Sequence, residues 1–398
     1  MGKAQAMTLT QRPLLAVYSA QFCSAFADNA LLITAIAILK SMEHSHQIPW
    51  LQAIFVLPFI LLAPFVGVFA DSHAKGRVMM LGNGLKLIGA ASLIFDLYPL
   101  WGYALVGIGA AIYSPAKYGI LSQLVSSEQL VKANAWMEGS TLVAILLGVV
   151  IGGFLADWSV VASLWLLIGV YMLAALLNLG IPKLAAERPY QGESLRQLLF
   201  IFAQEVSALW RHPQARATLI GTSAFWATGS TLRLMLFAWV PVALLVEDNQ
   251  LPATLMGMVS IGIMIGAGFA AWRLQHNQLM HALIGGLLLS PLLFALAYTT
   301  NLSLAVLLLI AIGAAGGWFI VPLNAALQHH GQAHMGTGRA LAVQNLWENL
   351  AMFVAVSLYG LVIGSVDVIS LIVLLSLLLG AILIALTLNL ARKQTTPA

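Results

Sequence analysis

Six charged side chains lie inside long apolar stretches of this 398-residue chain. Three are basic and three are acidic: Lys86, Lys117, Arg233, Asp28, Glu138 and Glu348. Insertion scales put each such charge at about 2.5 to 3.5 kcal/mol at the centre of a membrane-spanning helix, so six facing lipid would cost roughly 15 to 20 kcal/mol. We therefore expect all six to face protein or water.

The mixture of charges favours a ligand that carries both signs. Lysine and arginine side chains suit phosphate, whereas separated carboxylates suit an ammonium group. A zwitterionic phospholipid headgroup would use both. A sugar site would contain more polar and aromatic side chains, and a simple proton-coupled exporter would need only an acid.

Depth in the apolar runs separates candidate ligands from candidate structural charges. Asp28 lies centrally between Arg12 and Lys40, Arg233 lies close to the middle of its run, and Lys117 lies toward the cytoplasmic side. A deep charge is costly and usually marks a substrate or ion path, so we expect these three to bind substrate. The full substrate-binding set that we predict is Asp28, Asn29, Lys117, Arg233, Asn324 and Glu348.

The alternative is that the charges pair across helices and only hold the protein together. Glu138 could pair with Lys117 or with Lys86, and for Lys86 and Glu138 a structural or gating role is as good an explanation as a ligand role.

The sequence predicts neither catalysis nor a metal or cofactor. His329, His330 and His334 lie in an expected loop that has no carboxylate or cysteine to complete a metal site. The single cysteine, Cys23, excludes an intramolecular disulfide. The chain has no nucleotide-binding loop, no zinc-protease motif and no nucleophile elbow, so we expect a protein that is not an enzyme.

Composition indicates an all-α integral membrane protein. Hydrophobic residues make up 61% of the chain and charged residues 8%, and the mean hydropathy is +0.93. Apolar runs long enough to cross a bilayer recur along the chain, without the alternation of barrel strands. We predict twelve transmembrane helices, at about 14 to 39, 50 to 70, 78 to 97, 100 to 121, 133 to 156, 160 to 181, 217 to 246, 253 to 273, 280 to 298, 302 to 325, 339 to 363 and 367 to 390.

The basic residues predict the orientation. Most of the 18 lysines and arginines fall in alternate loops on one side. The opposite loops contain Lys40 and the acids Glu43, Asp157, Glu247, Asp248 and Asp367. Both termini are therefore expected in the cytoplasm, and the pI near 9.2 reflects this topology rather than nucleic-acid binding.

A long polar interruption divides the chain into two six-helix bundles, at residues 1–182 and 217–398, with a cytoplasmic linker at 183–216. Apolar residues recur at helical spacing in the linker: Leu195, Leu198, Leu199, Phe202, Val206 and Leu209. This periodicity predicts a helix that either lies on the membrane surface or serves as an ordinary packed connector.

The two halves carry similar short sequences at corresponding places. "GAAIYSPAK" (109–117) and "GGWFIVPLN" (316–324) each place a proline six residues after a glycine, in the fourth span of each half. "NAWME" (134–138) and "QNLWE" (344–348) each place an amide four residues before a glutamate, in the fifth span. We infer a parallel repeat of one six-helix unit.

The segment "GVFADSHAKGR" (67–77) resembles the loop signature of the major facilitator superfamily, and Asp71 and Arg77 are accordingly expected as structural or gating charges. Five longer stretches resemble, in the same order, the bacterial lysophospholipid transporter (LplT) family within it. They are "QFCSAFADNALL", "APFVGVFADSHAKGRVMMLGNGLKLIGAAS", "YSPAKYGIL", "LVKANAWMEGSTLVAILLG" and "VPLNAALQ".

This resemblance implies two pseudo-symmetric bundles whose first and fourth helices line a central cavity, which would place Asp28, Lys117, Arg233 and Asn324 there. It also implies a function: moving lysophosphatidylethanolamine and related lysophospholipids, such as lysophosphatidylglycerol, from the outer to the inner leaflet of the bacterial inner membrane. On the inner leaflet an acyltransferase/acyl-ACP synthetase, functionally coupled to the transporter, would reacylate these lipids.

Two other functions remain compatible with the residues. A proton-coupled exporter of amphipathic small molecules would use Asp28 or Glu348 as the proton carrier. A membrane-embedded scaffold for an acyltransferase would use the charges only as structural pairs and would transport nothing.

Overall fold

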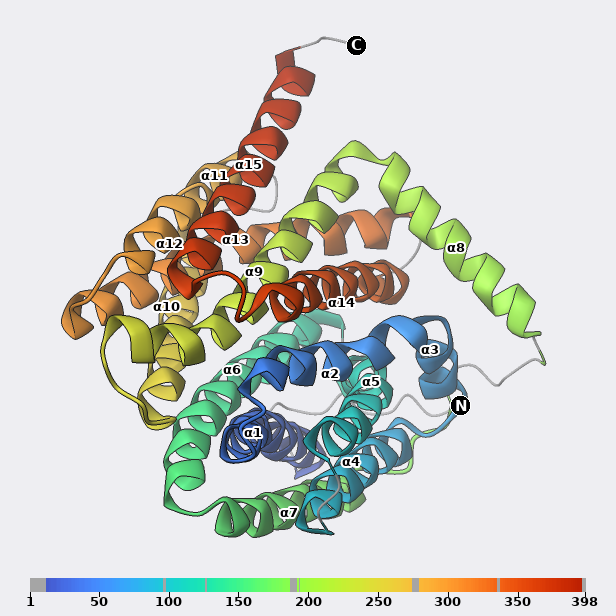
Figure 1. The fold of residues 1–398 in the computed structure, drawn as a ribbon. Helices are drawn as coiled ribbons and strands as arrows, with labels where there is room; N and C mark the ends of the chain where they lie inside the picture. Colours follow the sequence, from blue (N-terminus) through green and yellow to red (C-terminus); the bar gives the residue numbers. More distant parts are fainter. Residues whose placement is uncertain are drawn as a thin grey trace. The chain divides into compact units, whose positions relative to one another are not determined.

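The computed structural model describes residues 12–95, 98–125, 127–186, 192, 194–273, 279–334 and 337–395, and nearly all of them are helical (Figure 1). Its contacts divide the chain into two compact units. The first contains residues 1–43 and 57–199, and the second contains residues 44–56 and 200–398. The chain thus passes between the units before the second helix, again inside that helix after Val56, and a last time after Leu199, inside the predicted linker.

Seven α-helices and two short 3₁₀ helices, η2 (Leu93–Phe95) and η3 (Asn178–Gly180), account for most of the first unit. The α-helices are α1 (Arg12–Ser41), α2 (Ile48–Leu61, of which only the part from Leu57 belongs here), α3 (Ala63–Ser72), α4 (Lys75–Ser92), α5 (Pro99–Leu124), α6 (Ser127–Trp158) and α7 (Val160–Leu177). Several starts follow from local sequence. Pro99 lies in the first turn of α5, where its missing N–H is not needed, and the Ser159 hydroxyl caps α7 by accepting from the Ala162 N–H at 3.2 Å.

The second unit contains the remaining helices. They are α8 (Leu195–Arg211, from residue 200), α9 (Pro213–Ala243), α10 (Gln250–Arg273), α11 (Leu279–Gly286), α12 (Leu289–Ala297), α13 (Leu302–His334), α14 (Thr337–Val362) and α15 (Val368–Thr395). Pro213 begins α9, and the Asp367 carboxylate caps α15 by accepting from the Ser370 N–H at 2.9 Å.

Helix packing inside each unit follows the repeat that the sequence predicts. In the first unit α1 packs against α6 and α7, and α4 packs against α7. In the second unit α9 packs against α14 and α15, and α12 packs against α15. The two similar proline segments lie on α5 and α13, and the two similar amide–glutamate segments lie on α6 and α14. These three helix pairings therefore occur in both units.

Ten helical segments of the described chain are long and apolar enough to cross a membrane, and α2 with α3 can form an eleventh. The predicted span at 217–246 falls on α9, which has 31 residues but is more polar because Arg233 and several serines and threonines lie in it. The chain is thus a multi-pass helical membrane protein, and its helices are consistent with the predicted twelve spans.

Two spans are not the continuous helices that we predicted. The span at 50–70 bends by 63° between α2 and α3, where Pro64 provides no N–H for a helical bond and clashes with the turn before it. The span at 280–298 consists of α11 and α12, joined by a tight turn at Leu287 and Leu288 just ahead of Pro291. In both places the proline interrupts the backbone hydrogen-bond ladder.

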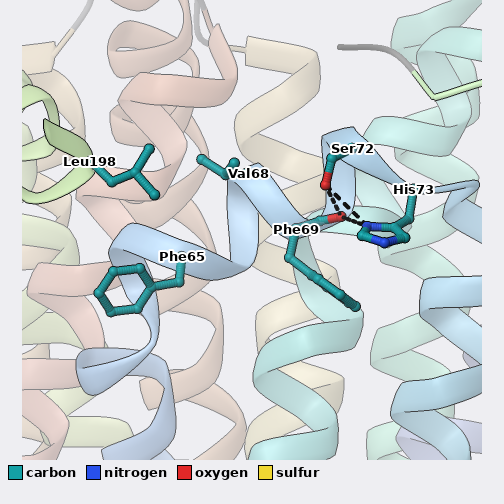
Figure 2. A pocket seen from close by; sticks show the side chains of 6 residues that line it. All are labelled: Phe65, Val68, Phe69, Ser72, His73 and Leu198. Atoms are coloured by element: carbon teal, nitrogen blue, oxygen red, sulfur yellow. Dashed lines mark hydrogen bonds between the residues drawn. The ribbon is translucent and has the colours of Figure 1, made fainter. Parts of the chain in front are cut away.

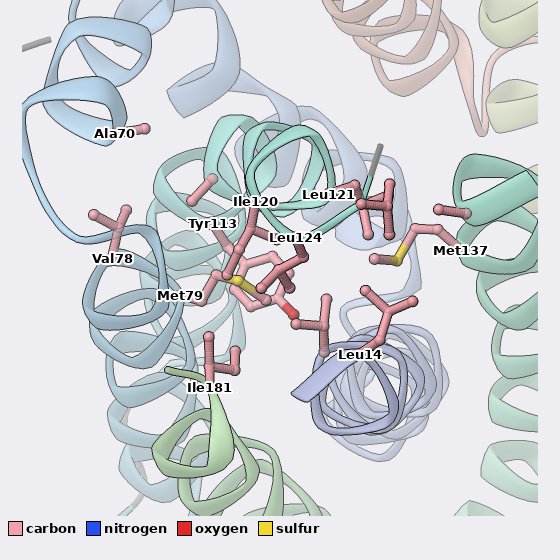
Figure 3. Packing of buried hydrophobic residues seen from close by; sticks show 14 residues of the cluster. Leu14, Ala70, Val78, Met79, Tyr113, Ile120, Leu121, Leu124, Met137 and Ile181 are labelled. Carbon is pink, nitrogen blue, oxygen red and sulfur yellow. The ribbon is translucent and has the colours of Figure 1, made fainter. Parts of the chain in front are cut away.

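Buried side chains fill the first unit at the end where α1 begins (Figure 3). Leu14 from α1, Met79 from α4 and Met137 from α6 meet there with a row from α5 that includes Tyr113 and Ile120. This packing holds α4 and α5 against α1 and so helps to position the charged residues that these helices carry.

Candidate functional site

Asp28 of α1 is the centre of a buried polar cluster in the first unit. Its Oδ2 lies 2.6 Å from the Lys86 ammonium of α4, and its Oδ1 accepts a hydrogen bond from the Tyr171 hydroxyl of α7 at 2.8 Å. Lys86 is 2% exposed, whereas the Asp28 side chain is 15% exposed. Three helices therefore meet at one carboxylate whose charge a lysine balances.

Lys86 has further partners on both sides. Its ammonium donates to the Ser24 hydroxyl at 2.9 Å, and that hydroxyl donates to Asn83 Oδ1 at 2.8 Å. The ammonium also lies 5.1 Å from the centre of the Tyr113 ring, within cation–π range. Because Lys86 and Asp28 balance each other's charge inside the protein, both charges are tolerated at this depth.

The sequence left Lys86 with a choice between a ligand role and a pair with Glu138. The structure gives it Asp28 as an ion-pair partner. The side chain of Glu138 lies outside the described residues, so its predicted pairing with Lys117 or with Lys86 stays a prediction.

Two further predicted ligands lie on helices of this cluster: Asn29 is on α1 with Asp28, and Lys117 is on α5 with Tyr113. Lys117 is 8% exposed on α5, one helical turn after Tyr113. The Asn29 amide donates to the Ala25 carbonyl at 2.8 Å, and its Cβ lies where a side chain on Gly148 of α6 would meet it. Both predicted ligand residues thus lie on α1 and α5, the two helices of this unit that the family resemblance implies as lining the cavity.

A second polar cluster lies in the second unit around Glu348 of α14. Glu348 is 8% exposed, and its Oε1 accepts from the Gln344 amide nitrogen at 2.6 Å. The same nitrogen donates to Asn324 Oδ1 of α13 at 2.7 Å. Arg233, half-buried, lies further along α9, which packs against α14.

The two clusters differ in how their carboxylates are balanced. Asp28 is held by a lysine and a tyrosine, whereas Glu348 accepts a hydrogen bond from an uncharged donor, the Gln344 amide. The structure thus brings together Asn324 and Glu348 in one unit and Asp28 and Lys86 in the other.

Asp71 and Arg77 flank the short connection between α3 and α4. Asp71 pairs at 2.7 Å with Lys75, whose side chain is 1% exposed and contacts the α5 backbone where Gly119 leaves room for it. Arg77 is exposed. The burial of Lys75 against α5 is a structural role that the sequence did not indicate.

A small apolar pocket of about 460 Å³ lies between α3 and the first turn of α8 (Figure 2). Phe65, Val68 and Phe69 line it together with Leu198, and the His73 ring at its edge bonds to the Ser72 hydroxyl at 3.0 Å. It contains none of the predicted site residues, so we regard it as separate from the candidate substrate site.

The linker helix α8 is amphipathic, and its two halves lie in different environments. In its C-terminal half Phe202, Val206 and Leu209 pack in a hydrophobic cluster of the second unit. In its first turns Leu195 and Leu199 are exposed. A packed connector therefore describes one half, and a membrane-surface helix remains the prediction for the other.

Sequence reasoning missed Tyr171, Ser24 and Asn83, although one signal could have found two of them. Ser24 lies one helical turn before Asp28, and Asn83 lies one turn before Lys86, so each polar residue shares a helix face with a buried charge. Tyr171 stands alone in an apolar helix, where an aromatic residue is ordinarily part of the core.

Comparison with known proteins identifies the family. The sequence model of the Major Facilitator Superfamily matches residues 17–356. "Lysophospholipid transporter LplT" of Citrobacter koseri is 49% identical over 357 residues, covering 89% of this chain and 90% of the relative. The protein of that name from Klebsiella pneumoniae is 48% identical over 358 residues, covering 90% of both, and that of Serratia proteamaculans is 49% identical over 356 residues, covering 89% of both. The chain belongs to the LplT family of the Major Facilitator Superfamily.

Solved structures support the superfamily fold. A crystal structure of a POT family transporter in complex with 5-aminolevulinic acid aligns with a TM-score of 0.73 over 97% of each chain at 13% identity. A second POT family transporter, in complex with a thioalcohol-conjugated peptide, aligns with a TM-score of 0.70. At such low identity the likeness concerns the fold alone. The resemblance read from the five sequence stretches is confirmed, and so is the predicted helical fold.

Proposed function

We propose that this LplT-family protein carries lysophospholipids, including lysophosphatidylethanolamine and lysophosphatidylglycerol, from the outer to the inner leaflet of the bacterial inner membrane by alternating access. The observation that carries the proposal is the 48–49% identity, over about nine tenths of the chain, to relatives named lysophospholipid transporters. A transporter role, rather than an enzymatic one, agrees with the superfamily membership.

The polar clusters suggest how the headgroup is bound. In the proposal Asp28 and Glu348 take the ammonium group, while Lys117 and Arg233 take the phosphate. Asn29 and Asn324 add hydrogen bonds. The support is that Asp28, Lys117 and Glu348 combine burial with positions deep in apolar helices, where a charge is costly and usually functional.

The single acyl chain is proposed to lie against apolar helix faces while the headgroup crosses. Bundles at 1–182 and 217–398 rock about the headgroup, and the linker at 183–216 connects them on the cytoplasmic side, with the first turns of α8 on the membrane surface. Both termini lie in the cytoplasm, as the basic loops favour. Reacylation inside, by an acyltransferase with its acyl-ACP synthetase, would then remove the product and pull flux inward.

Uptake in cells tests this proposal. Labelled lysophosphatidylethanolamine is offered to cells that lack their own transporter, with and without this protein, and with a protonophore added. We expect uptake that depends on the protein and survives the protonophore. Uptake abolished by the protonophore would favour the proton-coupled exporter of amphipathic molecules, and the absence of any protein-dependent uptake would favour the scaffold.

A further inference from the structure

The pair formed by Lys86 and Asp28 has the chemistry of the proposed ligand contact. A primary ammonium lies 2.6 Å from Asp28 Oδ2, and lysophosphatidylethanolamine carries a primary ammonium of the same kind. The Asp28 side chain is partly exposed, whereas Lys86 is almost wholly buried behind it. An incoming ammonium would therefore reach the carboxylate and compete with Lys86 for it.

Two hydrogen-bond donors near Lys86 have no acceptor among the described residues. The Asn83 Nδ2 atom and the Tyr113 hydroxyl are both buried and have no hydrogen-bond partner among the described residues. Buried donors are nearly always satisfied, so two beside one lysine call for an explanation. Together with the Lys86 ammonium they form a set of donors suited to an anion.

We propose that Lys86 is a placeholder that occupies Asp28 until the ammonium of the lipid displaces it, and that the released Lys86 turns to the phosphate with Asn83 and Tyr113. The inference rests on the proposed function and adds Lys86 as a residue that determines specificity. Charge is conserved: one ion pair and one zwitterion become two ion pairs, so no unpaired charge is created inside the protein. Tyr171 positions Asp28 throughout, through its hydrogen bond to Oδ1.

The alternative is a static pair that only joins α1 to α4. Removal of Lys86 destabilises the protein in both cases, because it leaves a buried carboxylate unpaired. The cases differ in what restores stability. A placeholder site accepts an ammonium from the lipid, whereas a static pair offers the lipid no access to Asp28.

Thermal unfolding of the purified full chain in detergent separates them. Wild type and Lys86→Met are compared with lysophosphatidylethanolamine, which has an ammonium, and with lysophosphatidylglycerol, which has none. We expect Lys86→Met to have a lower unfolding midpoint, and lysophosphatidylethanolamine to raise that midpoint by more than it raises the wild-type midpoint. Lysophosphatidylglycerol should not produce this additional gain.

Two further variants act as controls. Lys75→Met also removes a buried lysine from a carboxylate, but Asp71 is 45% exposed and can be solvated, so its response to the two lipids should match that of wild type. The double variant Asp28→Asn/Lys86→Met has no unpaired charge and should lose the additional gain with the ammonium-bearing lipid.

A milder change keeps the test decisive if Lys86→Met does not fold. Ser24→Ala removes one hydrogen bond that holds Lys86 in place, so the lipid ammonium should displace Lys86 more easily. We expect the KM for lysophosphatidylethanolamine to fall about fivefold, with kcat and the KM for lysophosphatidylglycerol little changed. A purely structural serine would give equal or higher KM values for both lipids.

Failure of this inference is distinguishable from failure of the proposed function. If neither lipid shifts the wild-type midpoint and no uptake occurs, the proposed function fails and the placeholder with it. If both lipids bind and are transported, but stabilise Lys86→Met equally, the function stands and the placeholder is wrong.

Discussion

At the scale of single residues, the partners of the buried charged side chains determine what these residues can do. The charges that the sequence identified find partners in distant segments of the chain. Lys86 meets Asp28 across 58 residues, and Tyr171 meets it across 143. In the second unit Gln344 joins Asn324 to Glu348 through one amide nitrogen. The arrangement makes Gln344 the residue that positions two predicted ligands.

Gln344→Ala should therefore impair transport although it changes no charge. The substitution removes a hydrogen bond from a buried carboxylate, where a charge-assisted bond is worth about 1.5 to 3 kcal/mol. We expect lysophosphatidylethanolamine uptake per molecule of folded protein to fall about tenfold or more. Thr387→Ala is the control, since that hydroxyl bonds within α15 to the Leu383 carbonyl and should leave uptake nearly unchanged. Equal rates for both variants would contradict the positioning role.

The sequence predicted which residues would be charged and deep, but not how they pair. The free-energy cost of placing a charged side chain in the bilayer depends on residue type and depth, both of which can be inferred from a sequence. Pairing depends on which helix faces meet, and the pattern of a mostly apolar helix does not specify that. For this reason the sequence indicated neither Tyr171 nor the ion pair of Lys86 with Asp28.

At the scale of helices, close crossings at glycine hold the fold together. A methyl group placed on Gly266 of α10 would collide with the backbone of Ala314 on α13, and one placed on Gly262 would collide with the backbone at Ile310. In the first unit Gly82 and Gly109 bring α4 and α5 together in the same manner. Small residues allow such approach in membranes, where lipid supplies little hydrophobic force between helices.

Gly266→Ala should destabilise the protein, because backbone atoms cannot yield as a flexible side chain can. We expect a loss of about 1 to 3 kcal/mol or more, measured as a lower thermal unfolding midpoint in detergent. Gly268→Ala, two residues later on the same helix, meets open space and should be neutral or gain up to about 1 kcal/mol from helix propensity. If the two variants unfold at the same temperature, the crossing is not as tight as described.

The sequence predicted the positions of the helices better than their continuity. Lengths of apolar runs locate spans directly, whereas the 63° break between α2 and α3 depends on how the chain responds to Pro64. Pro115 and Pro322 lie within α5 and α13 without ending them, so a proline alone does not indicate a break.

The first turns of α8 should contact lipid. In a Cys23→Ser background, cysteines at Leu199 and at Gln204, both exposed, are labelled with an environment-sensitive dye in reconstituted protein. We expect a blue-shifted emission at position 199 that lipid-borne nitroxides quench, and water-like emission at position 204, because the two lie on different faces of the helix. Similar spectra at both positions would rule out the membrane-surface placement.

At the scale of the whole molecule, each of the two units contains one polar cluster, and the two clusters differ in charge balance. The repeat was readable from short matching segments, because duplicated helices keep glycine and proline at corresponding places. Orientation in the membrane is a separate property, and it rests on the distribution of lysine and arginine.

Two serine positions test that orientation. Ser194 and Ser45 are both exposed, and the basic loops predict the first in the cytoplasm and the second outside. With Cys23→Ser as background, a membrane-impermeant maleimide applied to cells whose outer membrane is permeabilised should label Ser45→Cys and should label Ser194→Cys only after lysis. Labelling in the reverse pattern would invert the proposed topology and the inward direction of transport.

Transport itself, measured in a defined system, tests the central claim most directly. The purified protein is reconstituted in liposomes without any ion gradient, labelled lysophosphatidylethanolamine is added outside, and the lipid remaining accessible to external albumin is followed in time. We predict that accessible lipid falls faster in liposomes that contain the wild-type protein than in protein-free liposomes, and that Asp28→Ala and Arg233→Ala greatly reduce the difference. Equal rates with and without the wild-type protein would contradict lysophospholipid transport by this chain.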